Sequence, residues 1–523
     1  YTHDTTFDFN PKGHRETNYV LLGIAFLILF IAGINFTNLT TSLIPLRLKT
    51  INTHRVLGCS IYKLQAISLI ESIVICLISY ILALFIVNDL SYTPIANWVD
   101  ADIRLSQYKG LILLTALIAI LTGCLAGLYP AIRSTSYAPA LVLKGSFGLS
   151  PKGKKVRVAL IGFQYTVSIA LIIVTLFMGL QNHFMTSSEQ LGFNKDQVAI
   201  VNLTPEIYAK HKPQYIQKLK DYPGIEDVAF SVYELSKEDD MIDLEYARHE
   251  DKDVFFKVFY ASENFLSVMD IQVEEGRDFT REDLNKAQSD YIINPAAERD
   301  FHLHPGDRFN DRTVLGVSKD FRFNSCRIAS SPFVFALNND IPNPKLVSYI
   351  RFNSKTNLQE AVAHVRETLK EIDPTFPFEI SFYNTILNNL YQKEQTLGKL
   401  ISLFGIMAIL ISIVGVFGLV LFETQYRRKE IGIRKINGAT TGQILLMFNK
   451  TYIRIVSVCF IISIPIAWMG TQQWLENFAY KTPLHLWVFI VAFLIILSVT
   501  IGTVTFRNWQ AANENPVNSV KSE

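Results

Sequence analysis

Seven long apolar runs constrain the fold of this 523-residue chain more than any other feature of its sequence. A helix needs about 20 apolar residues to cross the roughly 30 Å hydrocarbon core of a bilayer, and each run reaches that length. Six runs contain no Asp, Glu, Lys or Arg, and the second run contains one acid, Glu71. The predicted spans are residues 19–39, 64–87, 110–132, 158–182, 400–422, 455–475 and 483–506.

The overall composition agrees with a membrane protein. Apolar residues make up 49% of the chain and charged residues 18%, and the mean hydropathy is +0.23. Soluble proteins rarely bury seven apolar runs of this length with a single charge among them, so the sequence predicts a polytopic α-helical membrane protein with seven spans. Residues 1–16 begin with Tyr and are polar, and we interpret them as the tail of a domain that continues upstream.

The distribution of Lys and Arg predicts how the spans are oriented. Short loops rich in these residues stay in the cytoplasm. The basic loops are 47–63, 133–157, 426–450 and the tail after residue 506. The loops 88–109 and 476–482 and the polar region 183–396 then lie on the opposite side. This arrangement places the N-terminus of the chain outside and its C-terminus inside.

The polar region 183–396 is long enough to form a domain with its own core. Residues 197–203 alternate or are fully apolar, as expected for a strand, and residues 359–372 have helical spacing. Four apolar residues share one face of that helix: Ala361, Val362, Val365 and Leu369. The region is therefore predicted to be one α+β extracytoplasmic domain.

A basic segment occurs twice, at matching places. The first basic segment, Arg47 to Gly58, follows the first apolar run, and the second basic segment, Arg427 to Gly438, follows the fifth. In each half a span, a basic loop, a span, a short outer loop, a span and a tail follow one another, which indicates duplication. The predicted organisation is a truncated tail (1–16), a three-span unit (17–150), a linker with one span (151–182), the α+β domain (183–396) and a second three-span unit (397–523).

The second basic segment has the pattern of a short amphipathic helix. It contains one acid, Glu430, and five cations: Arg427, Arg428, Lys429, Arg434 and Lys435. Ile433 and Ile436 share a helix face. Gly438 is expected to end the helix in the left-handed conformation, and Thr440 or Thr441 to cap the next helix. The residues alone leave two roles open, docking on a partner and anchoring at an anionic membrane surface.

Motifs for catalysis, nucleotide binding and metal binding are weak. The five Cys have no CxxC spacing, so neither a disulfide nor a metal site is predicted. Residues 148–155 spell GxxxxGK but lack the Ser or Thr that binds Mg²⁺, and His302 and His304 lack a third ligand. We expect no catalytic site, cofactor, metal or nucleic-acid partner in this chain. The mainly acidic residues 237–253 are read as a solvated loop or as a docking face for a basic partner.

Several stretches carry a resemblance to a known family. Arg428 to Ala439 resembles its KEIGIRK-x-x-GA loop, and Asn515 to Val517 closes the chain in the same way. The other stretches, in family order, are residues 24–38, 191–196, 275–279, 293–297 and 316–321. Together they resemble the FtsX/MacB-type permeases of bacterial ABC transporters, in a long, duplicated, eight-span form that is N-terminally truncated here.

The resemblance implies a function. The chain would be the permease subunit of an ATP-driven ABC transporter, coupling a separate cytoplasmic ATPase dimer to movement of periplasmic domains for export or extraction of a periplasmic or membrane substrate. ATP and Mg would bind that ATPase. A second permease subunit, identical or different, the lipid bilayer and a periplasmic adaptor or hydrolase would be further partners. The implied location is a bacterial inner membrane, with the N-terminus of this chain and residues 183–396 periplasmic and the C-terminus cytoplasmic.

The resemblance also assigns coupling residues. ATPase-coupling residues in the second basic segment would be Arg427, Arg428, Lys429, Glu430, Arg434, Lys435 and Gly438. A second, degenerate coupling loop would consist of Arg47, Lys49, His54, Arg55 and Gly58. The first segment has Thr50 in place of the Glu and Asn52 in place of a Gly, so weaker coupling and simple drift are both open. The alternative function is a non-transporting receptor or scaffold that regulates a periplasmic partner such as a peptidoglycan hydrolase.

Overall fold

The computed structural model describes residues 15–93, 96, 104–136, 151–187, 191–236, 243–286, 288–322, 324–337 and 346–513. The chain divides into two compact units. The helical unit comprises Tyr1–Met178, Thr396–Gln473 and Leu484–Glu523, and the soluble unit comprises Gly179–Gln395 and Trp474–Pro483.

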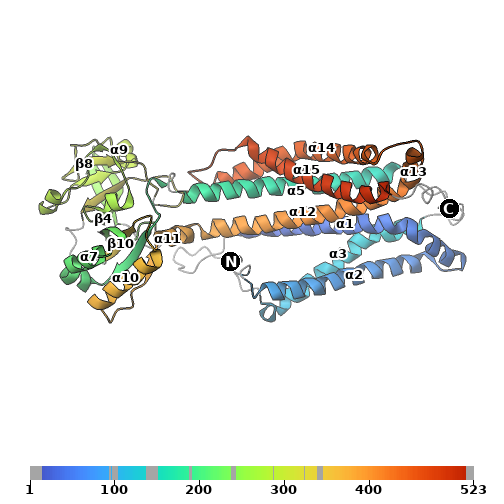
Figure 1. Ribbon diagram of the computed structural model, residues 1–523, viewed down its shortest axis with the longest axis horizontal. Helices are drawn as coiled ribbons and strands as arrows, with labels where there is room; N and C mark the ends of the chain where they lie inside the picture. Colours follow the sequence, from blue (N-terminus) through green and yellow to red (C-terminus); the bar gives the residue numbers. More distant parts are fainter. Residues whose placement is uncertain are drawn as a thin grey trace. The chain divides into compact units, whose positions relative to one another are not determined.

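Seven of the described helices are long and apolar enough to cross a membrane (Figure 1). They are α1 (Arg15–Val56), α2 (Ile61–Leu90), α3 (Lys109–Thr135), α5 (Pro151–Thr186), α12 (Gln392–Tyr426), α14 (Thr441–Leu475) and α15 (Leu486–Ala512). The prediction of a seven-span membrane protein is confirmed. α14 starts well before the predicted span 455–475, because its helix continues through polar residues beyond the apolar core.

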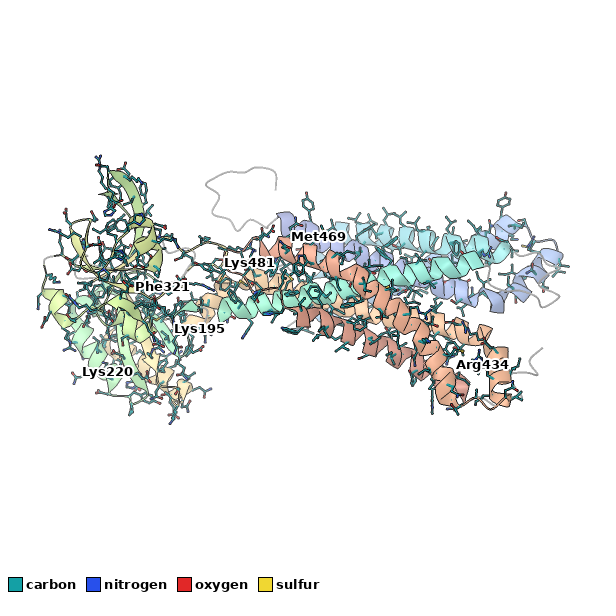
Figure 2. The ribbon with its side chains drawn as sticks, turned by 90° about the horizontal axis from the view of Figure 1, so that it is seen from above. Lys195, Lys220, Phe321, Arg434, Met469 and Lys481 are labelled. Atoms are coloured by element: carbon teal, nitrogen blue, oxygen red, sulfur yellow. The ribbon has the colours of Figure 1, made fainter. Side chains whose placement is uncertain are left out.

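The outer surfaces of these helices are apolar. Only 6% of the most apolar window of α2 is buried within the protein. On α14, Met469 (labelled in Figure 2) is 71% exposed. Exposed apolar surface of this extent is unfavourable in water, so lipid is the solvent of these faces.

Small residues allow close packing within the first three-helix unit. A Cβ added to Gly127 of α3 would lie 2.5 Å from the Cβ of Ser72 on α2, and one added to Gly123 would lie 3.0 Å from Cα of Ile73. Thr37 of α1 donates its hydroxyl to the carbonyl of Ala126 at 2.8 Å. Close backbone approach and interhelical hydrogen bonds of this kind drive association of helices in lipid.

Polar contacts join the two halves of the helical unit. Asn35 of α1 donates its side-chain amide to the carbonyl of Ile411 on α12 at 2.7 Å. Ser168 of α5 and Ser412 of α12 are hydrogen-bonded at 3.0 Å. Because these contacts lie in apolar surroundings, they fix which helices pack together.

The soluble unit contains an eleven-stranded sheet (Figure 1). Its strands are β1 (Val198–Leu203), β2 (Ile225–Ser231), β3 (Asp243–His249), β4 (Lys252–Ala261), β5 (Val273–Gly276), β6 (Tyr291–Ile293), β7 (Arg308–Phe309), β8 (Arg312–Ser318), β9 (Phe333–Leu337), β10 (Leu346–Phe352) and β11 (Ile380–Phe382). The order is β11-β1-β10-β2-β4-β9-β6-β8-β5, with β3 paired to β4 and β7 to β8. The pairs β4–β9 and β6–β8 are parallel, and the others are antiparallel.

Alternation along β1 divides the core between the two faces of the sheet. Ala199 and Val201 belong to the same cluster as α7 (Lys212–Lys220) and α10 (Leu358–Ile372). Val198 and Ile200 belong to the cluster that contains α8 (Phe265–Met269) and α11 (Tyr383–Leu390). The remaining short helices are η2 (Leu105–Gln107), η3 (Ile207–His211), η4 (Arg281–Asn285), α9 (Pro295–Phe301) and α13 (Arg428–Ile436). The prediction of an α+β domain is confirmed.

The loop between α14 and α15 packs as part of the soluble unit. The side chain of Gln181 donates to the carbonyl of Tyr480 at 3.0 Å and accepts from the N–H of Thr482 at 2.8 Å. The guanidinium of Arg322 lies over the Tyr480 ring at 4.1 Å. The compact unit is therefore larger than the region 183–396, because these loop residues have their partners there.

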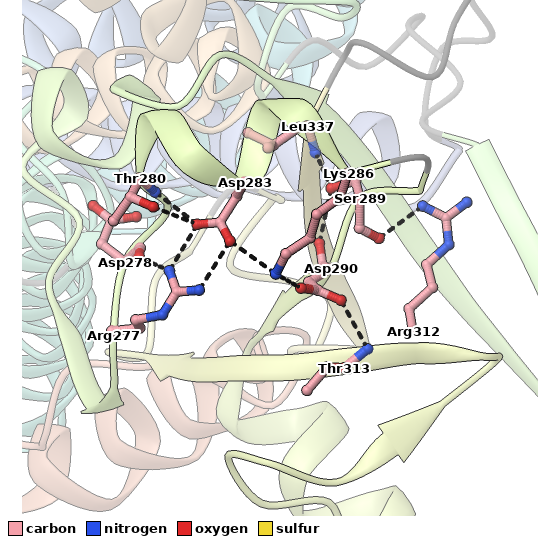
Figure 3. A network of polar contacts seen from close by, with 10 residues as sticks. All are labelled: Arg277, Asp278, Thr280, Asp283, Lys286, Ser289, Asp290, Arg312, Thr313 and Leu337. Atoms are coloured by element: carbon pink, nitrogen blue, oxygen red, sulfur yellow. Dashed lines mark hydrogen bonds and ion pairs between the residues drawn. The ribbon is translucent and has the colours of Figure 1, made fainter.

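A buried carboxylate organises the segment between β5 and β6 (Figure 3). Arg277 binds Asp283 through two hydrogen bonds of 2.7 and 2.9 Å, and Lys286 pairs with it at 3.0 Å. The N–H and hydroxyl of Thr280 also donate to Asp283, at 2.9 and 2.8 Å. Lys286 pairs further with Asp290, which accepts from the N–H of Thr313 at 3.1 Å. The guanidinium of Arg277 holds the pKa of Asp283 well below its ordinary value.

We predict that Asp283→Asn lowers the free energy of unfolding of the soluble unit by about 3 kcal/mol, because it leaves two cations without their buried partner. The lowered pKa of Asp283 means that the carboxylate stabilises the fold at pH values above about 4 and loses this effect as the pH falls further. Thermal unfolding of the full chain at pH 7 and at pH 3 measures both effects. Asp251→Asn is the matched control, because that side chain is 97% exposed. Equal midpoints for the two variants at pH 7 would contradict the prediction.

Candidate functional site

The second basic segment forms a short helix between two spans. α12 ends at Tyr426, Arg427 leaves the helical conformation with φ −94° and ψ 11°, and α13 follows directly. Gly438 ends α13 at φ +86°, where the N–H of Ala439 donates to the carbonyl of Arg434 at 3.0 Å. Because the left-handed region favours glycine, the backbone here has the conformation expected from the sequence.

The next helix begins with reciprocal capping. The N–H of Gln443 donates to the hydroxyl of Thr440 at 3.3 Å, and the N–H of Thr440 donates to the side-chain oxygen of Gln443 at 3.1 Å. Both groups would otherwise be unpaired at the start of α14. Thr440, one of the two residues expected to cap this helix, is therefore the capping residue.

The first basic segment also ends in a left-handed glycine, but no helix break precedes it. Here α1 continues without a break through Val56. Gly58 then takes φ +92°, and the N–H of Cys59 donates to the carbonyl of His54 at 3.0 Å. Ser60 caps α2 by accepting from the N–H of Lys63. Both segments thus end in a left-handed glycine followed by a capped helix.

The two segments expose the same positions. Gly58 and Gly438 are 380 residues apart, and with this offset residues 52–60 and 432–440 agree in burial class at every position. Asn52 and Gly432 are the buried pair. Residues 53, 54 and 56–58 are exposed, as are their counterparts 433, 434 and 436–438. The surface is duplicated although the residues differ.

Each exposed surface combines apolar and basic side chains. In the second segment Ile433 and Ile436 are 55% and 65% exposed, and in the first Val56 and Leu57 are 67% and 78% exposed. Figure 1 shows the two turns at the same end of the helical unit, and Figure 2 places Arg434 there. Helical spacing in the sequence predicts that Ile433 and Ile436 share one face, but no pattern marks Val56 and Leu57.

Two cations of the second segment form ion pairs with nearby glutamates. Arg427 pairs with Glu423 at 3.1 Å and with Glu430 at 3.9 Å, and its guanidinium lies 5.7 Å from the Phe448 ring of α14. Arg434 pairs with Glu430 at 2.8 Å. Arg427 therefore ties α13 to both neighbouring helices, while Arg434 remains 53% exposed.

Lys435 is half-buried and has no ion pair within the parts of the chain that the structure describes. Arg428 and Lys429 lie in α13 and Lys49 lies in α1, but their side chains are outside the described residues. Among the described side chains of the second segment, Arg434 and Lys435 are the cations that remain besides Arg427.

The first segment uses its cations mostly to hold its own helices. Arg47 pairs with Glu71 of α2 at 2.8 Å, so Glu71 faces the basic loop as an interfacial acid. Arg55 donates to the carbonyl of Thr135, the last residue of α3, at 3.1 Å. A cation at a helix C-terminus satisfies an otherwise unpaired carbonyl. His54 is exposed and remains available at the surface.

Other candidate chemistry is limited. Within the described residues, the ligand atoms of Glu275, Glu298 and His304 lie within 4.8 Å of one another. His302, the expected companion of His304, instead ends α9 at φ +53°. The five cysteines are free. Of the GxxxxGK stretch, residues 148–150 lie outside the described residues, and α5 begins at Pro151.

Two parts of the chain, residues 22–139 and 402–516, match the family described as FtsX-like permease C-terminal. The macrolide export ATP-binding/permease protein MacB of Aggregatibacter actinomycetemcomitans is 25% identical over 212 residues, which cover 38% of this chain and 32% of that protein. MacB of Neisseria gonorrhoeae is 25% identical over 223 residues, 40% of this chain and 34% of that protein. The chain therefore spans about a third of the length of these relatives.

Solved structures are similar to parts of this chain. The periplasmic region of MacB from Actinobacillus actinomycetemcomitans has 15% identity and a TM-score of 0.28, covering 38% of this chain and 94% of that chain. The extracellular domain of the noncanonic ABC-type transporter YknZ from Gram-positive bacteria has 16% identity and a TM-score of 0.27, covering 35% and 98%. Both family matches fall on the repeated three-helix units, and together with the MacB relatives they support an FtsX/MacB-type ABC permease.

Proposed function

We propose that this chain is the membrane subunit of an ATP-driven ABC transporter and that its two basic segments dock on a separate cytoplasmic ATPase dimer. One observation carries the proposal: the two segments expose the same pattern of positions at one end of the helical unit. A pair of similar surfaces suits a partner that is itself a dimer. The match to the FtsX-like permease family supports the same assignment.

The chemistry of the exposed side chains suits docking in a groove. Ile433 and Ile436 offer apolar contact, and Arg434 and Lys435 offer charge beside it. Well-packed apolar anchors supply most of the affinity of an interface, while surrounding charges select the partner. The complementary surface is a groove with an apolar floor and acidic walls.

The ion pairs of Arg427 would transmit movement from this surface. Because Arg427 holds α13 to Glu423 of α12 and lies over Phe448 of α14, a displacement of α13 would shift both spans. α12 follows α11 of the soluble unit after a single intervening residue, Tyr391. ATP-driven movement would therefore reach the soluble unit along a continuous helix, for export or extraction of a substrate.

The first segment would make the weaker contact. Its Arg55 binds the end of α3 and its Arg47 binds Glu71, which leaves His54 where the second segment has Arg434. Fewer outward cations mean weaker attraction to an acidic groove. The shared backbone geometry nevertheless supports a role as a contact.

The positive-inside bias supports a cytoplasmic position for both segments and for the C-terminus. The soluble unit would then face the periplasm in a bacterial inner membrane. A second permease subunit would complete the membrane part. In the periplasm, the acidic hairpin of β3 and β4, with Asp251 at its tip, would face any adaptor or hydrolase.

We predict that Lys435→Glu reduces the amount of ATPase recovered with the purified permease by at least tenfold. Lys435 has no ion pair within the described residues, so the change breaks none there. Placing like charges together at an interface costs several kcal/mol. His54→Glu, at the first-segment position that corresponds to Arg434, is the comparison variant and should reduce recovery by less than about fivefold. Both variants should insert in wild-type amounts. Unchanged recovery for both would mean that the segments are membrane anchors only, as a receptor or scaffold requires.

We predict opposite accessibility for two single cysteines placed in a background that lacks the native ones. A cysteine replacing Asp251 should react with a membrane-impermeant thiol reagent added to intact spheroplasts, because the residue is exposed in the soluble unit. A cysteine replacing Asn437 should react only after lysis. Labelling of residue 437 in intact spheroplasts would overturn the proposed orientation.

A further inference from the structure

An apolar groove of about 890 Å³ runs along the helical unit between α1, α5 and α14. Gly162 of α5 brings the two longer walls together, because a Cβ added there would lie 3.5 Å from Sγ of Cys459 on α14. Leu27 of α1 contributes to the lining. Lining residues such as Phe163 and Ile466 are 41% and 54% exposed, so the groove opens to the side that faces lipid.

One end of the groove carries unpaired positive charge. Arg454 lines it next to Ile455, at the end where Val158 stands on α5. Lys450 precedes Arg454 by one turn of α14, and both are exposed. Neither has a carboxylate partner within the described parts of the chain. A cation beside hydrocarbon is unfavourable without a counter-ion.

Duplication does not explain these cations. With the offset of 380 residues, the positions that correspond to Lys450 and Arg454 are Ile70 and Val74 of α2. The first unit therefore has apolar residues where the second has charge. The α5 wall adds to the contrast, because the sequence just before Val158 contains Lys152, Lys154, Lys155 and Arg157.

The length and lining of the groove suit a lipid chain. From Arg454 to Gly470 it extends roughly 24 Å at 1.5 Å per residue, enough for an acyl chain that reaches the middle of the roughly 30 Å hydrocarbon core. Most of the lining is apolar, and Arg454 is its one charged residue. A molecule with an anionic head and a hydrocarbon chain therefore places opposite charge at the cationic end and apolar surface along the rest.

We infer that this groove binds an anionic phospholipid, with its phosphate against Arg454 and Lys450 and an acyl chain along α5 and α14. The lipid comes from the leaflet on the side of the basic segments, where α14 begins. Basic sites between helices at this level are typical of recognition of anionic headgroups. A bound lipid joins α1 of the first three-helix unit to α5 and to α14 of the second unit, so it stabilises the contact between the two halves.

The test is native mass spectrometry of the full chain in detergent with added dioleoyl phosphatidylglycerol or dioleoyl phosphatidylcholine. These lipids have the same chains and differ in headgroup charge. Wild-type protein should retain one phosphatidylglycerol with a preference of about 25-fold over phosphatidylcholine, since each cation near the membrane surface contributes about fivefold. Arg454→Gln should reduce the preference to about fivefold, and Arg454→Gln with Lys450→Gln should abolish it.

Two further variants separate charge from shape. Val458→Trp fills the groove, because Val458 is one of its lining residues, and should abolish retention of both lipids. Lys63→Gln removes an exposed cation at the start of α2 and should leave the preference at the wild-type value. Equal retention of the two lipids by the wild type would overturn the proposal. Retention unaffected by Val458→Trp, or a lipid-free dimer held by this face, would overturn it as well.

Discussion

The helical unit depends on the contact between α1 and α12, because this contact carries a hydrogen bond between the first and the second three-helix unit. Asn35 donates to the carbonyl of Ile411, and Gly415 leaves the space, since a Cβ there would lie 2.4 Å from the Asn35 side-chain oxygen. In lipid, burial of apolar surface does not distinguish one helix pair from another. The Asn35 amide can form its hydrogen bond only when α1 packs on α12 in this way, so it specifies which helices pair. The hydrogen bond between Ser168 and Ser412 has the same role between α5 and α12.

The two basic segments expose the same positions although they share few residues. One is preceded by a helix break at Arg427 and the other by an uninterrupted α1, and most of their side chains differ. What they share is a glycine in the left-handed conformation and a capped helix after it. These two features fix the path of the backbone and therefore which positions face outward.

Local patterns predicted the parts of the fold that local physics determines. Apolar run length identified the seven spans, and helical spacing placed Ala361, Val365 and Leu369 on the buried face of α10. The attachment of the α14–α15 loop was not predictable, because Gln181 and Tyr480 are far apart in sequence and neither belongs to a motif. The internal pairing of Arg427 and the capping of α3 by Arg55 were missed for a related reason. A basic loop indicates charge on one side of a membrane but not which cations face inward.

That distinction decides what each cation of the second half can do. Arg427 is mostly buried, pairs with Glu423 and lies over the Phe448 ring, so its charge holds α13 to the neighbouring helices. Arg454 lines an apolar groove, and its guanidinium has no carboxylate partner among the described residues. Near hydrocarbon, where water does not screen charge, a cation must find its counter-ion in the protein or in the lipid. Arginine therefore holds helices together at position 427 and is available to bind a ligand at position 454. The presence or absence of a nearby carboxylate determines which of these two roles it has.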